Sequence, residues 1–243
     1  MKKLLFSTLF VAGFFYSAMS QQTSPGVTTR TYTEDDMKKK VVKDSAGVIV
    51  PYEQWTKLTH SGLYTFTSGS MEAETLTLKR MTPGEIAFRE SQSLPPMPSP
   101  SFPTGAKMEM FSAKDITGKK VNPKELAGKI IVLNFWFIAC PPCKDEIPAL
   151  NKITNKYAGN DNVVFIAVCL DQRSEINDYL KQTLFNYRHV ADGRFISEGF
   201  SVKSYPTNVL IDRQGIIRFS SMGYGPGTVK WLGKAIDEIY SEN

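Results

Sequence analysis

The sequence predicts an α/β domain with a mixed central sheet flanked by helices, preceded by a small α+β unit. An apolar run rich in β-branched and aromatic residues, 130–138, is typical of a strand buried on both faces. A second apolar run, 163–170, predicts a parallel neighbour, because the helical pattern between the runs supplies the crossover that parallel strands need. A proline-rich stretch at 93–105 separates this domain from the smaller unit.

The N-terminal segment has the pattern of a secretory signal peptide. Lys2 and Lys3 precede an apolar run, 4–18, that ends in Ala18-Met19-Ser20 before Gln21, with small residues at the expected cleavage site. The run is short for a membrane span, which needs about 20 residues. We therefore expect residues 1–20 to be cleaved and the protein to work in the periplasm or elsewhere outside the cytoplasm. An uncleaved N-terminal anchor is the alternative, and only that alternative predicts a membrane contact.

Composition argues against a nucleic-acid-binding protein. The 243-residue chain has a formal net charge of +5, which falls to +3 without Lys2 and Lys3. The remaining basic residues are spread along the chain, with no basic block and no interleaved aromatic stripe. We therefore expect no nucleic acid among the partners. The cysteine content excludes a further class, because three cysteines are too few for a structural disulfide framework.

The region 21–92 predicts a small α+β unit whose role the sequence does not define. A polar lead, 21–31, precedes its globular pattern. The aromatic residues of the unit are expected to form a minimal core rather than a binding platform, because small units need every large apolar side chain. The predicted elements are a basic helix at 35–43, a helix around Trp55 and Leu58, and strands at 64–66 and 76–78.

The proline-rich stretch predicts a linker. Five prolines fall between Pro95 and Pro103. Proline has no backbone N–H and favours extended polyproline geometry, so such a segment does not build a core. We therefore expect 93–105 to be a semi-rigid spacer between the first unit and a domain at 106–243. A proline-rich ligand for a partner's aromatic groove is the weaker interpretation, because no charged anchor residue lies within the segment.

In the domain at 106–243, the order of the predicted strands and helices implies that the strand at 130–138 is central in the sheet. A turn at 115–121 predicts a β-hairpin with its first strand at 108–111 and a helical turn at 122–126 after it. The later predicted helices are at 141–157, from the cap Ser174 to Leu184, and at 228–240. The later predicted strands are at 163–170, 207–211 and 216–221, with a turn at 212–215 between the last two.

A Cys-Pro-Pro-Cys motif lies between the predicted buried strand and the helix that follows it. A helix N-terminus offers unpaired N–H groups and the positive end of the helix dipole, and both stabilise a thiolate. We therefore expect Cys140 to be the nucleophile and Cys143, one turn deeper, to be the resolving thiol. Pro141 and Pro142 stiffen the loop between the sulfurs, whereas Pro148 is expected to kink the helix.

These residues resemble the thioredoxin superfamily, and specifically its TlpA/ResA-like extracytoplasmic thiol–disulfide oxidoreductases. The resemblance covers about 106–240 and leaves the region before the linker outside it. It implies a thioredoxin-like fold for the domain. The motifs that carry it are the hairpin at 115–121, the strand at 129–136, the CPPC helix with Glu146 and Pro148, the strand end at 168–171, Tyr205-Pro206-Thr207 and the turn at 212–215.

The resemblance also implies which residues form the site. Pro206 would be a cis-proline that faces the disulfide, and the Tyr205 backbone would pair with an extended client segment. Glu146 would be a titrating group behind the thiols that assists deprotonation of Cys143, with a solvated surface glutamate as the alternative. Further contacts with the client are implied for Thr207, Trp136, Pro141 and Pro142.

Two positions depart from the wider family. Many members carry tryptophan immediately before the first cysteine, where this chain has Ala139. Thioredoxins proper carry a buried aspartate in the central strand, where this chain has Asn134. The absence of the tryptophan removes an apolar shield near Cys140. We expect this to change the contacts with a client and to leave the redox chemistry unchanged.

The sequence therefore predicts an enzyme that reduces disulfides of client proteins. It would need no metal and no cofactor besides the Cys140–Cys143 disulfide, and a membrane or periplasmic thiol protein would return the electrons. The same steps run backwards would oxidise a client. Because about 30 mV of reduction potential corresponds to only about 1.4 kcal/mol, the reducing direction rests on the family resemblance.

Several alternatives remain at this point. Half a zinc site would need two further ligands, and Cys169, His60 and His189 show no ligand spacing, while a static disulfide seldom begins a helix after a buried strand. A thiol peroxidase would want proline and threonine where Leu133 and Phe137 stand. A copper chaperone would use His189, and a redox-inactive interaction module would perform no exchange.

Cys169 is expected to be a buried reduced cysteine, with a third redox thiol as the alternative.

Overall fold

The computed structural model describes residues 32–60, 62–67, 72–225 and 227–242. The predicted signal peptide and the polar lead lie outside the described residues. The chain divides into two units, Met1–Lys38 and Lys39–Asn243. Within its described part, the first unit has the short helix α1 (Glu34–Lys38), whose start is capped by reciprocal hydrogen bonds between Thr33 and Asp36.

A small three-stranded sheet begins the second unit. Helix α2 (Tyr52–His60) packs on this sheet. The Trp55 ring contacts the Phe66 ring edge-on, with the ring centroids 5.6 Å apart. The predicted α+β character is confirmed, but residues 41–43 form a strand rather than the end of a helix, because a neighbouring strand pairs with their backbone. The strand order is β1 (Val41–Lys43), β3 (Thr75–Arg80) and β2 (Tyr64–Phe66), with β1 parallel and β2 antiparallel to β3.

The predicted linker is only partly a spacer. It contains no helix or strand, as expected, but its second half packs on the following domain. The Phe102 side chain is 1% exposed and stacks on Phe135 with ring centroids 5.4 Å apart. The backbone N–H of Ser99 donates to the Ser220 hydroxyl at 3.1 Å. The prediction that this stretch contributes nothing to a core is therefore wrong for its last residues, because one aromatic side chain anchors it.

The five-stranded sheet confirms the predicted central strand. Strand β6 (Ile130–Trp136) is buried along its whole length, with the parallel neighbour β7 (Val163–Cys169) on one side and the antiparallel neighbour β9 (Thr207–Ile211) on the other. The outer strands pair antiparallel on the β9 side and parallel on the β7 side. The order across the sheet is β10 (Ile217–Met222), β9 (Thr207–Ile211), β6 (Ile130–Trp136), β7 (Val163–Cys169) and β8 (Arg188–Val190).

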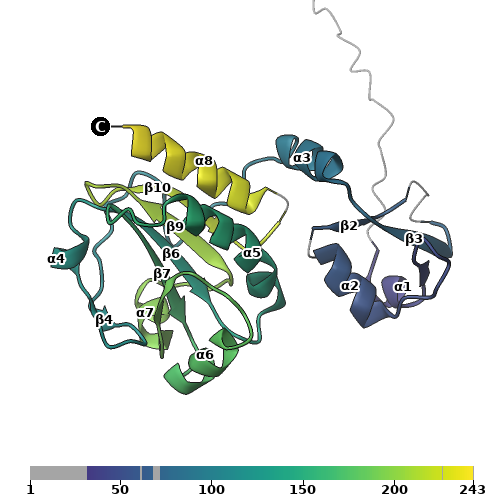
Figure 1. Ribbon diagram of the computed structural model, residues 1–243, viewed down its shortest axis with the longest axis horizontal. Coiled ribbons are helices and arrows are strands. Elements are labelled where there is room, and N and C mark those ends of the chain that lie inside the picture. The colour runs from purple at the N-terminus through teal and green to yellow at the C-terminus, as the bar shows by residue number, and fades with distance from the viewer. Residues whose placement is uncertain (1–31, 61, 68–71, 226, 243) are drawn as a thin grey trace, which may run out of the picture. The chain divides into compact units, whose positions relative to one another are not determined.

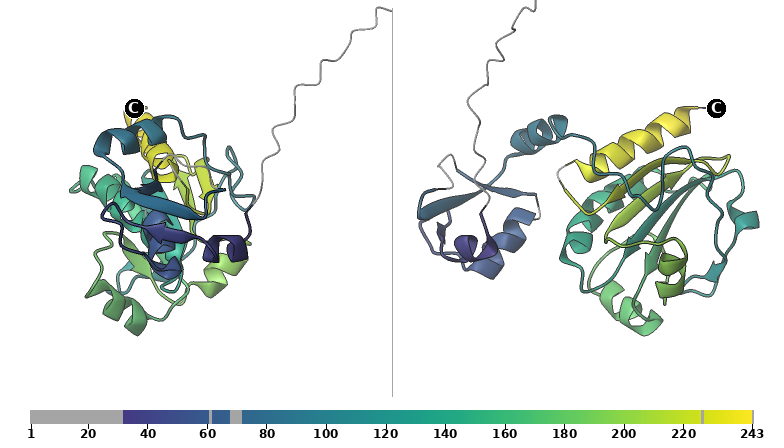
Figure 2. Two further views of the ribbon diagram at one scale, coloured as in Figure 1. Left: turned by 90° about the vertical axis from the view of Figure 1, so that its right-hand side faces the viewer. Right: turned by 180° about the vertical axis from the view of Figure 1, so that it is seen from behind.

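Two hydrophobic cores cover the two faces of this sheet. Alternate residues of β6 point to opposite sides, so Val132 and Trp136 join one core while Leu133 and Phe135 join the other. The first core is closed by α5 (Pro141–Lys156) and α8 (Thr228–Ser241), which lie side by side (Figures 1 and 2). The second core receives Phe102 together with side chains near α4 (Pro123–Leu126) and α7 (Arg194–Gly199). The predicted mixed sheet with helices on both faces is confirmed.

Several element boundaries differ from the predictions. The hairpin consists of β4 (Ala113–Lys114) and β5 (Lys120–Val121), so its first strand follows the predicted segment 108–111. Helix α6 (Arg173–Leu180) begins after Gln172 rather than Ser174, because Gln172 and Glu175 form the capping box. Leu184 lies outside this helix and is exposed rather than on its apolar face. The elements that the sequence did not predict are α3 (Pro83–Ser91), β8 and α7.

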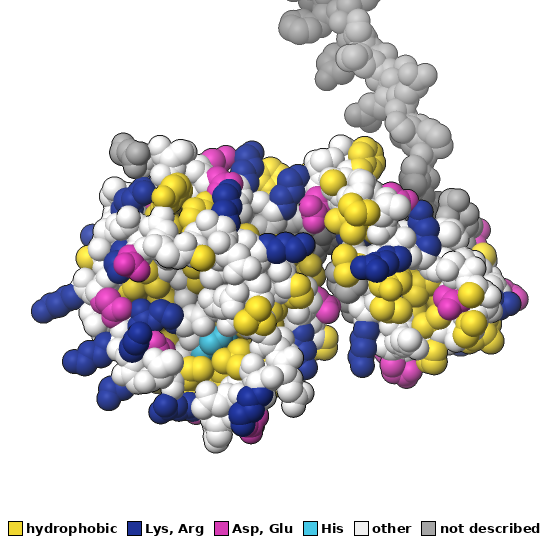
Figure 3. Space-filling view, viewed as in Figure 1, with side chains coloured by type: hydrophobic (Ala, Val, Ile, Leu, Met, Phe, Trp, Pro, Cys, Tyr) yellow, Lys and Arg dark blue, Asp and Glu magenta, His cyan; other side chains and the backbone are white. Residues whose placement is uncertain are grey.

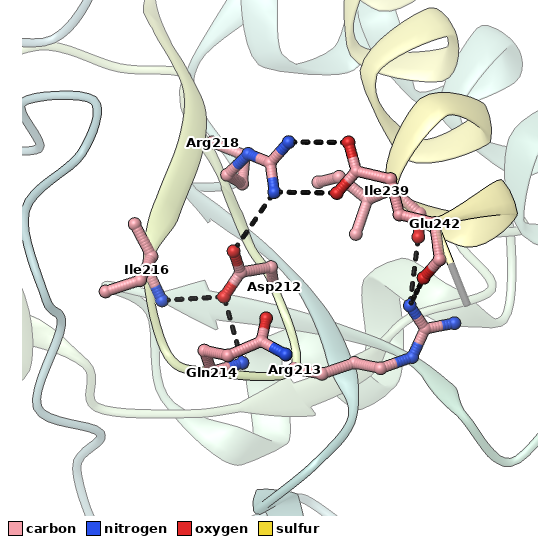
Figure 4. A network of polar contacts seen from close by, with 7 residues as sticks. All are labelled: Asp212, Arg213, Gln214, Ile216, Arg218, Ile239 and Glu242. Atoms are coloured by element: carbon pink, nitrogen blue, oxygen red, sulfur yellow. Dashed lines mark hydrogen bonds and ion pairs between the residues drawn. The ribbon is translucent and has the colours of Figure 1, made fainter.

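The predicted turn at 212–215 is confirmed and ties the end of α8 to the sheet (Figure 4). The Asp212 carboxylate accepts hydrogen bonds from the backbone N–H groups of Gln214 and Ile216, at 3.0 and 2.9 Å. Arg218 donates to Asp212 and, through two nitrogens, to Glu242 after the helix. The network therefore fixes the last turn of α8 against β9 and β10.

The surface of the described residues carries mixed charge. On the face drawn in Figure 3, Lys and Arg side chains are scattered over the surface with acidic side chains among them. Among the described residues, no helix has the length and apolar character that a membrane span requires.

Candidate active site

The Cys-Pro-Pro-Cys motif lies where β6 gives way to α5. Cys140 is the N-cap of the helix, and its Sγ accepts a hydrogen bond from the backbone N–H of Cys143 at 3.2 Å. The two sulfurs form a disulfide with an S–S distance of 2.05 Å. Pro141 and Pro142 occupy the first helical positions, where a missing N–H removes no helical hydrogen bond. The predicted placement of the cysteine pair on the first turn of a helix is therefore confirmed.

The loop that delivers Cys140 is held by the neighbouring strand. Asp171 follows β7, and its Oδ2 accepts a hydrogen bond from the backbone N–H of Ile138 at 2.6 Å. The backbone N–H of Leu170 donates to the Trp136 carbonyl at 3.1 Å. These contacts fix the backbone on both sides of the turn from strand to helix. The sequence marked the end of β7 as a motif but did not predict its contact with the cysteine loop.

A cis-proline lies beside the same end of β6. The Tyr205–Pro206 peptide bond is cis, as the family resemblance implied. Because Thr207 pairs with Phe135 in the β6–β9 register, Pro206 comes level with the end of the strand that leads to the cysteines. The Tyr205 ring meets Phe137 edge-on at 5.5 Å, and the Pro206 carbonyl accepts from the Gly223 N–H at 2.7 Å. The cis-proline turn and the cysteine loop are thus neighbours.

The expected client contacts divide into exposed and buried groups. Pro141 is exposed, and Pro142 and Tyr205 are half-buried, so all three can meet a partner. Trp136 is fully buried against Tyr179, Phe185 and His189, so the expected client contact of its side chain is wrong. The residue ends a strand whose alternation turns its ring into the core rather than toward the loop.

Thr207 is a second correction. Its side chain is buried, and its hydroxyl donates to the Ser204 carbonyl at 2.8 Å. The hydroxyl therefore supports the chain around the cis-proline, and the expected contact of this side chain with a client is wrong. Pro206 is also buried, so a client would meet the backbone of this turn more readily than its ring.

Glu146 lies buried behind the cysteine pair, one turn further along α5 than Cys143. Its Oε1 accepts from Asn134 Nδ2 at 2.7 Å and its Oε2 accepts from Asn208 Nδ2 at 2.9 Å. Burial raises the pKa of this carboxyl to about 8, against the opposing effect of the two amide hydrogen bonds. The alternative of a solvated surface glutamate is therefore wrong. A group with such a pKa can take up or release a proton near neutral pH.

Both cysteines of the disulfide are nearly inaccessible, with Cys140 3% and Cys143 1% exposed. Cys143 faces the core, as predicted, and contributes to the cluster that α5 and α8 cover. Cys140 belongs to the same cluster, but its neighbours in the chain, Ala139 and Pro141, are exposed. In the disulfide form, a partner therefore reaches the pair from the Cys140 side.

The third cysteine is separate from this pair. Cys169 is a free thiol, fully buried at the end of β7, where it pairs in register with Trp136. Its Sγ donates to Asp171 Oδ2 at 3.2 Å. Burial raises the pKa of the thiol well above its usual range. The expectation of a buried reduced cysteine is confirmed, and these surroundings disfavour a third redox thiol.

His189 is placed poorly for a distal metal ligand. It lies buried in β8, with Nε2 at 3.0 Å from the Phe185 carbonyl, and burial lowers its pKa. Trp136 and Phe185 enclose the ring. Among the described residues, no group of three or more His, Cys, Asp or Glu side chains gathers in a way that could hold a metal ion.

Asn208 is the site residue that sequence reasoning did not find. It lies in β9, directly opposite Asn134 in β6, and the two amides share the Glu146 carboxylate. A signal was present, because an asparagine interrupts each of two otherwise apolar strands. Two buried amides in apolar strands require a polar partner, which here is the carboxylate.

Comparison with known proteins places the site in context. Residues 104–220 match the family model of the AhpC/TSA family. The thioredoxin-like protein YneN of Bacillus subtilis is 30% identical over 115 residues, which are 46% of this chain and 68% of YneN. The thiol-disulfide oxidoreductase ResA of Bacillus cereus is 34% identical over 113 residues, which are 46% of this chain and 65% of ResA.

A solved structure supports the same placement. A candidate thiol:disulfide interchange protein DsbE from Chlorobium tepidum is 26% identical, with a TM-score of 0.52, and the match covers 57% of this chain and 98% of that chain. The match to ResA spans slightly less than two thirds of the length of ResA. The similarity therefore concerns the domain that carries the cysteine pair.

Proposed function

The chain belongs to the TlpA/ResA-like thiol–disulfide oxidoreductases of the thioredoxin superfamily, and on this premise we propose that it reduces disulfides of client proteins outside the cytoplasm. The observation that carries the proposal is the Cys140–Cys143 disulfide on the first turn of α5, with cis-Pro206 beside it and Glu146 buried behind it. This arrangement supplies a nucleophile, a docking turn and a proton acceptor.

The first step is attack by the Cys140 thiolate on one sulfur of a client disulfide. A new S–S bond joins Cys140 to the client, and the other client sulfur leaves as a thiolate that takes up a proton. The N–H of Cys143, which donates to Cys140 Sγ, and the positive end of the α5 dipole favour the ionised sulfur. Cys140 is suited to this role because its neighbours Ala139 and Pro141 are exposed, whereas Cys143 lies one turn deeper.

The second step releases the client. Cys143 loses its proton toward Glu146, and its thiolate attacks Cys140 Sγ. The bond between Cys140 and the client breaks as the Cys140–Cys143 disulfide forms, and the client sulfur leaves as a thiolate that takes up a proton, which makes the client a dithiol. Two electrons have then passed from the cysteine pair to the client. The buried position of Glu146, one turn after Cys143, supports its role as the proton acceptor.

The client would dock along the cis-proline turn. The described structure has no backbone hydrogen bond from the Tyr205 N–H or to its carbonyl, so both groups are available to an extended peptide. Exposed Pro141 and half-buried Tyr205 would flank the client sulfur. A client segment that pairs with backbone would be selected for an extended conformation more than for particular side chains.

The location and the electron source complete the proposal. The signal-like segment at 1–20 supports export to the periplasm or beyond, where client disulfides persist. A membrane or periplasmic thiol protein would then reduce the Cys140–Cys143 disulfide after each turnover. The reducing direction is proposed from the family, since sequence motifs alone allow either direction.

Reduction of a test disulfide protein checks the proposal. The reduced wild-type chain should reduce insulin with a dithiol as the electron source, and Cys140→Ser should abolish this activity. Cys143→Ser should instead accumulate a mixed disulfide with the client, visible on a non-reducing gel. Cys169→Ala is the matched control and should retain the wild-type rate. Equal rates for the wild type, Cys140→Ser and Cys143→Ser would overturn the proposal.

A further inference from the structure

We propose that Asn208 is a positioning residue for the exchange reaction, which holds the Glu146 carboxylate from the strand that carries the cis-proline and sets its affinity for a proton. The inference rests on the proposed function and extends it to a residue that has no contact with the sulfurs. It begins from a cluster of three fully or almost fully buried polar side chains, Asn134, Glu146 and Asn208.

The backbone places the two amides together before any side chain is considered. Asn134 and Asn208 are directly opposite in the antiparallel β6–β9 register. Opposite residues of antiparallel strands project to the same face of the sheet, and here that face is covered by α5. The Glu146 side chain extends from α5 and accepts a hydrogen bond from each amide. The three residues therefore meet because a helix and two strands converge, although 62 positions separate Glu146 from Asn208.

The hydrogen bonds orient the Asn208 amide. Asn134 Nδ2 donates both to Glu146 Oε1, at 2.7 Å, and to Asn208 Oδ1, at 3.0 Å. Because the Asn208 carbonyl oxygen accepts from Asn134, its NH2 group turns to Glu146 Oε2 at 2.9 Å. Each carboxylate oxygen thus receives one N–H, and Asn134 fixes the direction of the second amide. An arrangement in which both neighbours donate favours the ionised carboxylate over the acid.

Among the described residues, the groups that lower the pKa of the Glu146 carboxyl are the two amides and not a cation. Burial raises the pKa of Glu146, and the effects that lower it are the hydrogen bonds from Asn208 and Asn134. The other titratable groups that interact with the carboxylate are Tyr187, before β8, and Tyr224, after β10, whose pKa values are raised by burial and by the Glu146 charge. On its own helix, Glu146 follows Asp145 and lies one turn after Cys143. Removal of one amide donor should therefore shift the proton affinity of Glu146 directly.

The position of Asn208 in the chain links two parts of the site. It lies two residues after Pro206, and it pairs with Ser221 of β10 on the other side. The strand that presents the docking turn therefore also holds the proton acceptor. The register of β9 against β6 consequently fixes the acceptor and the docking turn relative to each other.

Titration of the Glu146 carboxyl tests the inference without any client. The full-length chain is prepared in its disulfide form with 13C-labelled glutamate, and Glu146→Gln identifies the signal. In Asn208→Leu, the midpoint should rise by about one pH unit relative to wild type, a tenfold weaker acid. Ser221→Ala is the matched control, because Ser221 is the buried cross-strand partner of Asn208 in β10, and its midpoint should stay at the wild-type value.

A second pair of variants guards against a folding defect. Asn208→Thr and Asn208→Val have nearly the same shape and differ by one hydroxyl donor. The threonine variant should titrate closer to wild type than the valine variant, and equal midpoints for the two would overturn the inference. A folded Asn208→Leu with an unmoved midpoint would overturn it as well.

The pH profile of client release connects the titration with the reaction. The attack of Cys143 on the Cys140–client disulfide should reach its half-maximal rate at higher pH in Asn208→Val than in wild type, by the same shift as the carboxyl midpoint. A shifted midpoint with an unchanged release profile would overturn the positioning role. Absence of exchange by the wild type would instead count against the proposed function, because the carboxyl titration does not depend on exchange.

Discussion

The Asp171 carboxylate and the backbone N–H of Ile138 are joined by a 2.6 Å hydrogen bond between the end of β7 and the loop before Cys140. The same oxygen, Oδ2, accepts from the Cys169 thiol at 3.2 Å. One carboxylate therefore serves the loop that delivers the nucleophile and the buried thiol on the next strand. Because the loop contains no regular secondary structure, this contact substitutes for the sheet hydrogen bonds that end at Trp136.

Loss of that carboxylate should destabilise the domain. Asp171→Ala leaves the Ile138 N–H and the Cys169 S–H without their acceptor, which should lower the free energy of unfolding by about 1–3 kcal/mol. Urea denaturation of the disulfide form measures the change. Asp178→Ala is the control, since its ion pair with Lys181 is exposed and should contribute less than about 1 kcal/mol. Equal stability of Asp171→Ala and the wild type would show that the hydrogen bond does not hold the loop.

Glu146 should make the stability of the protein depend on pH. The unfolded carboxyl has a pKa near 4.5, whereas burial raises the folded value to about 8. Between these values the folded protein binds a proton that the unfolded chain has released, so the free energy of unfolding falls as pH rises through the window. The loss from pH 4.5 to pH 8 should be on the order of a few kcal/mol.

The comparison with Glu146→Gln isolates this effect. Urea denaturation of both disulfide forms between pH 5 and pH 9 should show a stability difference that grows in favour of the glutamine variant as pH rises. Any constant effect of the substitution is the same at every pH, and buried His189 contributes equally to both proteins. Parallel pH profiles for the two would contradict the raised pKa of Glu146.

Phe102 should contribute strongly to stability although it lies in a proline-rich segment. Its ring is buried between Phe135 and Phe200, so Phe102→Ala should cost about 3–5 kcal/mol through lost contacts and the cavity left behind. Thermal or urea denaturation measures the loss. Leu94→Ala, at a residue 82% exposed in the same segment, should change stability by less than about 0.5 kcal/mol. Similar small effects for both would show that the segment is a spacer throughout.

The sequence predicted the central strand and the cysteine helix because their signals are local. The apolar run from Ile130 is long and unbroken, and the Cys-Pro-Pro-Cys motif marks where the strand ends and the helix begins. The hairpin of β9 and β10 was predictable for the same reason, since the polar turn at 212–215 separates two segments with a strand pattern. Glu146 could be proposed from its spacing to Cys143, but its burial could not, because one turn of helix sets a direction and not a depth.

Two of the elements that escaped prediction are very short, and several site contacts depend on distant partners. Strand β8 has three residues and α7 has six, too few for a periodicity to show. Phe102 lies among prolines, and its burial depends on Phe135 and Phe200, which no local pattern reveals. Asn208 meets Glu146 only through the pairing of β9 with β6. These contacts belong to the tertiary structure, so the sequence can mark Asn208 as a polar residue in an apolar strand but does not identify its partner.

The position of β6 between two paired neighbours has a consequence for how the protein withstands repeated turnover. The backbone amides of this strand should be among the slowest in the protein to exchange with deuterium, because each is paired and shielded on both faces. The cysteines that make and break covalent bonds are attached a few residues beyond this slow region. Bond rearrangement at the sulfurs is therefore separated from the part of the molecule that opens last, and the fold need not loosen each time a client leaves.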